Sequence, residues 1–220
     1  LVTTADRDGV RRLLVGGIAV TPTVLQVRSV VAIGADRVVF TANDVDDATQ
    51  VNVWRWDASR GITAITADAG IHGVIVGGDT TVVVAATVKD APKTYVLNGP
   101  TITSHAETPL VELNISFAKV GERRLATALL LPRDHQPGTK VPVLLDPYGG
   151  PHAARVVQSR NSHLTSQWFA DQGFAVVVID GRGTPGRGSA WERAVHHDLA
   201  TPVLDDQVDG LLALAEQCPD

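Results

Sequence analysis

Short apolar segments alternate with turn-forming residues along the first hundred residues of the chain. Four of these segments predict β-strands, at residues 26–33, 37–42, 50–56 and 61–66. Glycine, aspartate and serine occur in the joints between them, and these residue types favour tight turns. We therefore expect this part of the chain to be all-β.

The same part repeats itself at an interval of 44 residues, which separates Gly17 from Gly61 and Val38 from Val82. Four strands at a period of roughly 40–45 residues are typical of a blade of a β-propeller. A β-sandwich has a similar strand spacing but does not need the repeat. We therefore favour propeller blades over a sandwich.

One complete blade, residues 26–66, is followed by a second over residues 73–105 and preceded by half of another over residues 10–20. A propeller ring closes with about four to eight blades. Two and a half blades cannot close such a ring, so we expect the chain to be a fragment of a longer protein. Trp54 and Trp56 share one face of a strand, where we expect them to pack between blades rather than to form a binding platform.

The pattern changes after about residue 107. Apolar segments now predict strands at residues 112–118, 125–131, 141–146 and 174–179, and helices at 164–172 and 204–217. The first two strands form a hairpin, and the valine-rich run after Gly173 indicates a strand buried on both faces. In the last helix one face is shared by four apolar residues, Val208, Leu211, Leu212 and Ala215.

Strand, helix, strand and helix with short connections predict an α/β unit with right-handed crossovers. Preceded by the hairpin, this unit looks like the first half of an α/β-hydrolase sheet. We therefore predict a mixed fold in two incomplete domains. Residues 1–107 would form all-β propeller blades, and residues 108–220 the N-terminal half of an α/β-hydrolase domain.

The turn after residue 145 is the best candidate for chemistry. An apolar strand stops at Asp146, and Tyr148 stands directly before Gly149, Gly150 and Pro151. Glycines permit positive φ and a close approach of the backbone, while proline stiffens the exit of the turn. Functional groups collect at the carboxyl ends of strands in open α/β sheets. We therefore expect Tyr148 to be held in one place beside a site.

Three motifs in this order resemble the prolyl oligopeptidase family of serine peptidases, and within it the dipeptidyl-peptidase IV-like members. They are Pro147-Tyr148-Gly149-Gly150-Pro151-His152, Ile179-Asp180-Gly181-Arg182-Gly183-Thr184 and Asp205-Asp206-Gln207-Val208-Asp209. In that family the tyrosine hydroxyl belongs to the oxyanion hole, which stabilises charge on the substrate carbonyl oxygen. The resemblance gives this role to Tyr148.

The resemblance implies a serine-type peptidase that hydrolyses short peptides through an acyl-enzyme, as a dipeptidyl aminopeptidase does. Its serine would stand in a Gly-x-Ser-x-Gly elbow, and the chain contains none. Ser189 follows Gly188 in a glycine-rich loop and is no credible nucleophile. We expect the catalytic serine, acid and histidine to lie outside this chain, which alone should be inactive.

Three alternatives stay open. An acylaminoacyl-peptidase or an esterase could use the same scaffold, and a non-catalytic protein could bind partners through its propeller. No paired glutamate motif, which the family's aminopeptidases use to hold the substrate amine, occurs in the blades. The preference for a free peptide N-terminus therefore rests on the resemblance alone.

Other candidate residues have simpler explanations. Arg182 could bind a substrate carboxylate, but we expect it mainly to organise its loop. His196 and His197 are neighbours and do not converge on one point, so we expect no metal there. Asp205 and Asp206 open the predicted last helix, where acidic side chains suit the helix dipole.

Charge and cysteine content narrow the setting. The net charge of −5 with scattered Lys and Arg argues against nucleic-acid binding, and we expect no cofactor. No run of 18 apolar residues occurs, so we expect no membrane span. The single cysteine, Cys218, cannot form an intrachain disulfide, which favours the cytoplasm. We expect a short peptide as substrate and leave a homo-oligomer open.

Overall fold

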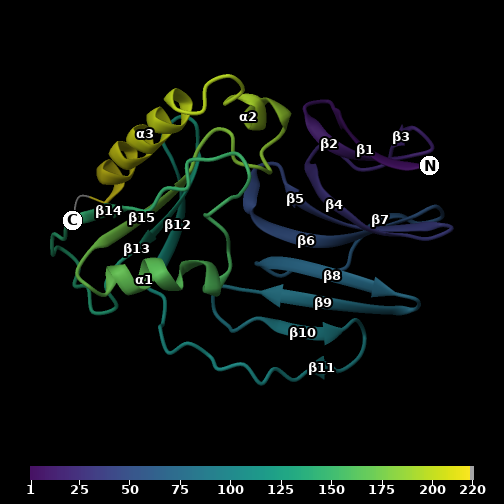
Figure 1. Ribbon diagram of the computed structural model, residues 1–220, viewed down its shortest axis with the longest axis horizontal. Coiled ribbons are helices and arrows are strands. Elements are labelled where there is room, and N and C mark those ends of the chain that lie inside the picture. Colours follow the sequence, from purple (N-terminus) through teal and green to yellow (C-terminus); the bar gives the residue numbers. More distant parts are fainter. Residues whose placement is uncertain (219–220) are drawn as a thin grey trace. The chain divides into compact units, whose positions relative to one another are not determined.

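The computed structural model describes residues 1–218, and the last two residues of the expected second domain lie outside this range. The described residues divide into two units. Unit 1 consists of Leu1–Thr108 with two short segments from later in the sequence, Val157–Ser159 and Gly186–Ala190. Unit 2 contains the other residues from Pro109 onward. The first part of the chain contains only strands, whereas helices accompany the strands in the second part (Figure 1).

The strands of unit 1 form two sheets. The smaller sheet joins β1 (Val2–Arg7), β2 (Val10–Val15) and β3 (Ile18–Ala19). The larger sheet has the order β11-β10-β9-β8-β6-β5-β4, and β7 also pairs with β6. Its strands are β4 (Leu25–Ile33), β5 (Arg37–Asp44), β6 (Asp47–Asp57), β7 (Gly61–Ala64), β8 (Ile71–Gly77), β9 (Thr80–Ala86), β10 (Lys93–Val96) and β11 (Thr101–Ile102).

The larger sheet consists of two four-stranded blades that meet at one point. Every pairing within β4–β7 and within β8–β11 is antiparallel. The blades meet in one parallel pair, Val51 with Ile71. Unit 1 is therefore a partial propeller. Its first blade has three strands rather than the expected half, because residues 2–7, which lack an apolar run, pair with β2 along their whole length.

The core of unit 1 packs β2 of the smaller sheet against the first full blade. Its buried members are Leu13, Leu25, Val27, Val38, Phe40 and Ala42. Trp54 and Trp56 pack against this cluster together with Ile62. The prediction that the two tryptophans serve packing is confirmed.

Two buried threonines accept similar hydrogen bonds in successive blades. The Thr21 hydroxyl accepts a hydrogen bond from the backbone N–H of Leu13 on β2 at 3.1 Å. The Thr66 hydroxyl accepts one from the N–H of Val53 on β6 at 2.9 Å. Both threonines end the segments that begin at Gly17 and Gly61. Each hydroxyl thus supplies the acceptor that a following strand would otherwise provide.

A buried histidine fastens the two blades where they meet. The N–H of Val51 donates to the carbonyl of Gly70 at 3.0 Å. The carbonyl of Val51 lies 3.0 Å from Nδ1 of His72, which is buried. A carbonyl oxygen can only accept, so Nδ1 carries the proton. Both polar groups of Val51 are therefore satisfied by the second blade.

Unit 2 contains a four-stranded sheet with the order β12-β13-β15-β14. Its strands are β12 (Ile115–Val120), β13 (Leu125–Leu130), β14 (Val143–Leu145) and β15 (Ala175–Asp180). Its helices are the 3₁₀ turn η1 (Arg160–His163), α1 (Leu164–Ala170), α2 (Ser189–Arg193), whose first two residues belong to unit 1, and α3 (Thr201–Gln217). β14 and β15 are parallel, and every residue of β15 is buried, as its valine-rich sequence predicts.

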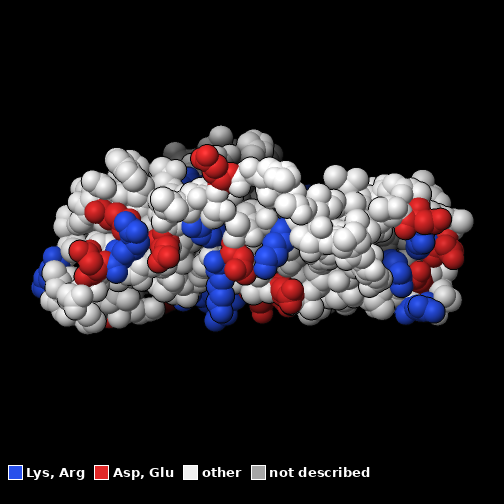
Figure 2. Space-filling model, turned by 90° about the horizontal axis from the view of Figure 1, so that it is seen from below, with Lys and Arg blue, Asp and Glu red and all other residues white. Residues whose placement is uncertain are grey.

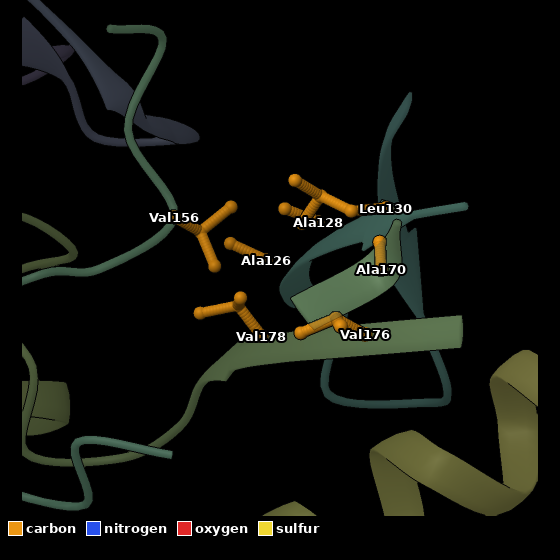
Figure 3. Close-up of a cluster of buried hydrophobic side chains, with 7 residues drawn as sticks. All are labelled: Ala126, Ala128, Leu130, Val156, Ala170, Val176 and Val178. Atoms are coloured by element: carbon orange, nitrogen blue, oxygen red, sulfur yellow. The ribbon is translucent and has the colours of Figure 1, made fainter. Parts of the chain in front are cut away.

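Alternate residues of β15 build two cores on opposite faces of this sheet. Val176 and Val178 join a cluster that includes Ala170 of α1, and the side chains of this cluster point toward one another (Figure 3). Val177 and Ile179 join a second cluster that includes Leu214 of α3. The two helices therefore cover opposite faces, and unit 2 has the three-layer arrangement of the first half of an α/β-hydrolase sheet.

Helix α3 differs from the prediction in its start and in its buried face. It begins at Thr201, because Asp198 accepts hydrogen bonds from the backbone N–H groups of Ala200 and Thr201. Its buried residues are Asp206, Gln207, Gly210 and Leu214. On the predicted apolar face, Val208 and Leu212 are 47% and 61% exposed.

A close approach explains the face that α3 buries. A Cβ atom at Gly210 would lie 2.9 Å from Cδ1 of Ile179, so the glycine lets the helix backbone rest on β15. The Gln207 amide donates to the carbonyl of Ile179 at 3.0 Å. Packing and polar partners, rather than apolar periodicity, therefore set the orientation of this helix.

Charges on the surface are mixed. On the face drawn in Figure 2, Lys and Arg side chains alternate with Asp and Glu side chains and form no continuous basic area. Among the helices of residues 1–218, none combines the length and the apolar character needed to cross a bilayer.

Candidate active site

Tyr148 stands in a turn built by its two following glycines. Gly149 has φ +64°, a left-handed conformation that favours glycine. A Cβ atom at Gly150 would lie 2.9 Å from Cε1 of Tyr148 and 3.2 Å from its hydroxyl oxygen. The tyrosine ring therefore folds back over Gly150. Tyr148 is nevertheless 41% exposed.

The turn also rests on helix α3. A Cβ atom at Gly149 would lie 3.1 Å from Cγ1 of Val203, in the first turn of that helix. Gly149 is thus constrained twice, by its backbone conformation and by its neighbour. Any side chain there would be strained and would press on Val203.

A polar network fixes the strand end that leads into the turn. The Asp146 carboxylate follows β14 and accepts hydrogen bonds from Nη2 of Arg155 and from the Ser166 hydroxyl, both at 2.7 Å. Ser166 belongs to α1 and Arg155 to the loop after the turn. Charge-assisted hydrogen bonds of this kind are short and strong, so the residue two positions before Tyr148 is held from two sides.

The neighbouring strand ends in a second aspartate. Asp180 accepts hydrogen bonds from the backbone N–H groups of Arg155 at 2.9 Å and of Val156 at 2.8 Å. Burial raises the pKa of Asp180, although these bonds and the Arg155 charge act in the opposite direction. Arg155 therefore joins the ends of the two parallel strands, its side chain to Asp146 and its backbone to Asp180.

Arg182, considered above as a substrate ligand, binds helix α3 instead. Its backbone N–H donates to Asp206 at 2.6 Å, and its Nη2 lies 2.9 Å from the same carboxylate. Asp206 is fully buried. The explanation of Asp206 by the helix dipole is wrong, because the helix begins at Thr201 and Asp206 lies beyond its first turn.

The remaining candidates lie as follows. Ser189 is buried, and its N–H donates to the carbonyl of Gly9 within unit 1. The rings of His196 and His197 lie 3.7 Å apart between centroids. Over residues 1–218 no three His, Cys, Asp or Glu side chains come together as metal ligands would. His152, in the loop after the turn, is exposed.

Sequence reasoning missed the pair of strand-end aspartates and their link through Arg155. One signal was available, because Asp146-Pro147 and Asp180-Gly181 both place an aspartate and a turn former directly after an apolar strand. Parallel neighbouring strands bring their carboxyl ends to the same edge of a sheet. Arg155, the partner that the two aspartates share, lies in a loop whose sequence has no periodic pattern, so the sequence does not indicate it.

Part of the chain is similar to a known family of peptidases. Residues 160–218 match the model of the prolyl oligopeptidase family. Dipeptidyl peptidase 8 of Mus musculus is 40% identical over 105 residues, which are 46% of this chain and 12% of that protein. Dipeptidyl peptidase family member 2 of Caenorhabditis elegans is 29% identical over 141 residues, 61% of this chain and 16% of that protein. The chain spans less than a fifth of these relatives.

Solved structures share the fold over nearly the whole chain. Dipeptidyl peptidase 4 of Porphyromonas gingivalis superposes with a TM-score of 0.83 at 19% identity, covering 99% of this chain and 34% of that one. The acylaminoacyl peptidase of Pyrococcus horikoshii superposes with a TM-score of 0.71 at 16% identity, covering 96% and 34%.

Proposed function

Because this chain belongs to the prolyl oligopeptidase family, we propose that it forms part of a serine peptidase that removes dipeptides from short peptides. In this enzyme the chain supplies the oxyanion-binding Tyr148 and part of the propeller. The dipeptidyl peptidases among its relatives support this substrate class, because they are 40% and 29% identical over the matched residues, against 16% for the acylaminoacyl peptidase structure.

The observation that carries the proposal is the geometry of the Tyr148 turn. An oxyanion hole needs a hydrogen-bond donor that is in place before the reaction, so that no reorganisation is required as charge develops. The contact with Gly150 holds the ring of Tyr148, and the residue is partly exposed, so its hydroxyl would be able to donate to an incoming carbonyl oxygen. Asp146 and Gly149 fix the chain on either side of it.

The reaction proceeds through an acyl-enzyme. A serine attacks the scissile carbonyl while a histidine takes its proton, and Tyr148 donates a hydrogen bond to the oxyanion of the tetrahedral intermediate. The histidine then protonates the leaving amine, and water hydrolyses the acyl-enzyme. The 220 residues contain no Gly-x-Ser-x-Gly motif, so other residues of the whole protein supply the nucleophile, and this chain alone is inactive.

The test is hydrolysis of chromogenic dipeptide anilides by the full-length protein and its Tyr148→Phe variant. Loss of an oxyanion donor should lower kcat by about ten- to a thousand-fold with little change in KM. The matched control is Tyr95→Phe, which removes the other tyrosine of this chain, on β10 of unit 1, and should leave kcat unchanged. Equal turnover by parent and Tyr148→Phe would refute the role of Tyr148.

The same substrates decide between activities. A dipeptidyl peptidase cleaves the anilide with a free N-terminus and rejects its N-acetylated form, whereas an acylaminoacyl-peptidase shows the opposite preference. Turnover of simple esters alone would favour an esterase, and no turnover of any substrate would favour a non-catalytic interaction protein. The acylaminoacyl peptidase neighbour shares the fold at 16% identity and does not favour either preference.

The setting is part of the proposal. Cys218 is exposed and forms no disulfide, which suits the reducing cytoplasm. Fractionation of cells that express the full-length protein tests this location. Sedimentation of the same protein decides whether it is a homo-oligomer.

A further inference from the structure

Arg182 makes more contacts with helix α3 than an ion pair needs. Its backbone N–H, Nε and Nη2 all reach the Asp206 carboxylate, at 2.6, 3.0 and 2.9 Å. The strand end and the helix also touch directly, because a Cβ atom at Gly181 would lie 2.7 Å from Cβ of Asp206. A fully buried carboxylate is costly unless its partners stay in place, so this contact has one stable arrangement.

The same guanidinium reaches the start of the helix. Nη2 of Arg182 donates to the carbonyl of Pro202 at 3.1 Å. Pro202 and Asp206 are four residues apart and therefore lie one above the other on one side of α3. Arg182 thus fixes both the position and the rotation of the first turn of this helix.

The first turn of α3 is the surface on which the tyrosine turn rests. Val203 follows Pro202, and its Cγ1 would lie 3.1 Å from a Cβ atom at Gly149. Gly149 directly follows Tyr148 and precedes the glycine over which the ring folds. A shift of the helix start would therefore move Gly149 and, with it, the tyrosine hydroxyl.

We propose that Arg182 and Asp206 are positioning residues for Tyr148, acting through Pro202, Val203 and Gly149. This inference rests on the proposed role of Tyr148 in the oxyanion hole. Neither residue touches the substrate. Their ion pair holds the surface against which the Tyr148 turn packs, so that the hydroxyl is in place when the oxyanion forms. Displacement of a reacting or binding group by about 1 Å can reduce turnover about a hundred-fold.

The chain offers a matched control for Arg182. Arg123 is the second cation near Asp206, with its Nη1 3.7 Å from the carboxylate, and it also pairs with Asp209. Arg123→Gln removes one cation from beside Asp206 and leaves the hydrogen bond from Arg182 to the Pro202 carbonyl in place. In an Arg182 variant, Arg123 in turn keeps one cation beside the buried carboxylate.

The first experiment is a double-mutant cycle in the full-length enzyme with dipeptide anilides. Arg182→Gln should lower kcat on the order of ten-fold with little change in KM, and Arg182→Lys should restore part of the loss. In the Tyr148→Phe background the same substitution should change kcat less than two-fold, because the hydroxyl it positions is already gone. Equal losses in both backgrounds would overturn the proposal and leave Arg182 a general structural residue.

The second experiment does not depend on activity. 3-Fluorotyrosine placed at position 148 alone reports the surroundings of the ring by ¹⁹F NMR. Arg182→Gln should shift or broaden its resonance, whereas Arg123→Gln should leave the resonance of the parent. An unchanged resonance in Arg182→Gln would overturn the positioning role of Arg182. This result does not depend on whether Tyr148→Phe shows Tyr148 to be an oxyanion donor. Failure of the proposed function appears instead as unchanged kcat in Tyr148→Phe with a displaced resonance in Arg182→Gln.

Discussion

The ring of Tyr148 lies over the backbone of Gly150, so closely that a Cβ atom at position 150 would come within 2.9 Å of Cε1. Although two residues apart in sequence, they are in direct contact, and the ring rests on the glycine. The addition of a single methyl group at position 150 should therefore displace the ring of Tyr148.

Gly150→Ala should move the tyrosine ring and lower the kcat of the full-length enzyme by about ten-fold or more, with a smaller change in KM. The backbone at Gly150 has no positive φ, so alanine is not excluded by conformation. The control is Gly73→Ala on β8, where no heavy atom lies within 4 Å of the added Cβ. Parent-like kcat in Gly150→Ala, with the protein folded, would show that the ring is not held by this contact.

The pH dependence of stability should carry the signature of Asp180. Burial raises its pKa above 3.8, so the folded chain keeps this proton to a higher pH than the unfolded chain does. Its contribution to the free energy of unfolding is therefore fully present below pH 3.8 and is lost as the pH rises through the raised pKa.

Asp180→Asn removes this titration while keeping an oxygen acceptor for Val156. In urea denaturation between about pH 4 and 7, the stability of the parent relative to Asp180→Asn should increase as the pH falls. Asp134→Asn, at an exposed aspartate of unit 2, serves as the control. A difference that stays constant with pH would mean that Asp180 does not titrate in this way.

The joint between the two blades should depend on His72. Replacing it by phenylalanine leaves the partly buried carbonyl of Val51 without its donor, which should lower the free energy of unfolding by about 1–3 kcal/mol. Denaturation monitored by tryptophan fluorescence measures the loss, because the tryptophans Trp54 and Trp56 lie in the adjoining blade. The exposed His105 provides the control in His105→Phe. Equal stability of the two variants would argue that the bond is dispensable.

Strand β14 should make the 220-residue chain associate. It lies at the edge of its sheet and, among residues 1–218, pairs only with β15, so the backbone groups on its other side have no neighbouring strand. Sedimentation of the isolated chain should show self-association that rises with concentration. Val143→Lys, which puts a charge at a half-exposed edge position, should reduce it. A monomeric parent chain with one cooperative melting transition would contradict this expectation.

Local pattern predicted most of the fold. The strands of the first full blade, the hairpin, β15 and α1 with Gly173 at its end all lie within a few residues of their expected positions, because periodicity and turn residues act over short distances. Gly173 has φ +100°, and its N–H donates to the carbonyl of Ala170. The strand β1 escaped prediction because it pairs through its backbone and carries few apolar residues.

The errors arose where tertiary contacts outweigh pattern. Helix α3 buries Asp206 and Gly210 and exposes Leu212, because a polar partner and a close backbone approach decide its rotation. In the same way, the turn residues around Tyr148 were visible in the sequence, but the support from Arg155 and Ser166 was not. The role of Tyr148 as an oxyanion donor stays a prediction, which the Tyr148→Phe variant tests.

The strand order of unit 2 also sets the order in which its parts can assemble during synthesis. The hairpin of β12 and β13 can form as soon as residue 130 has left the ribosome, but its neighbour β15 ends at Asp180, some fifty residues later. Each blade, in contrast, pairs strands that follow one another closely. The blades can therefore fold step by step as they emerge, whereas β13 must wait, with one side unpaired, for the strand that completes the sheet.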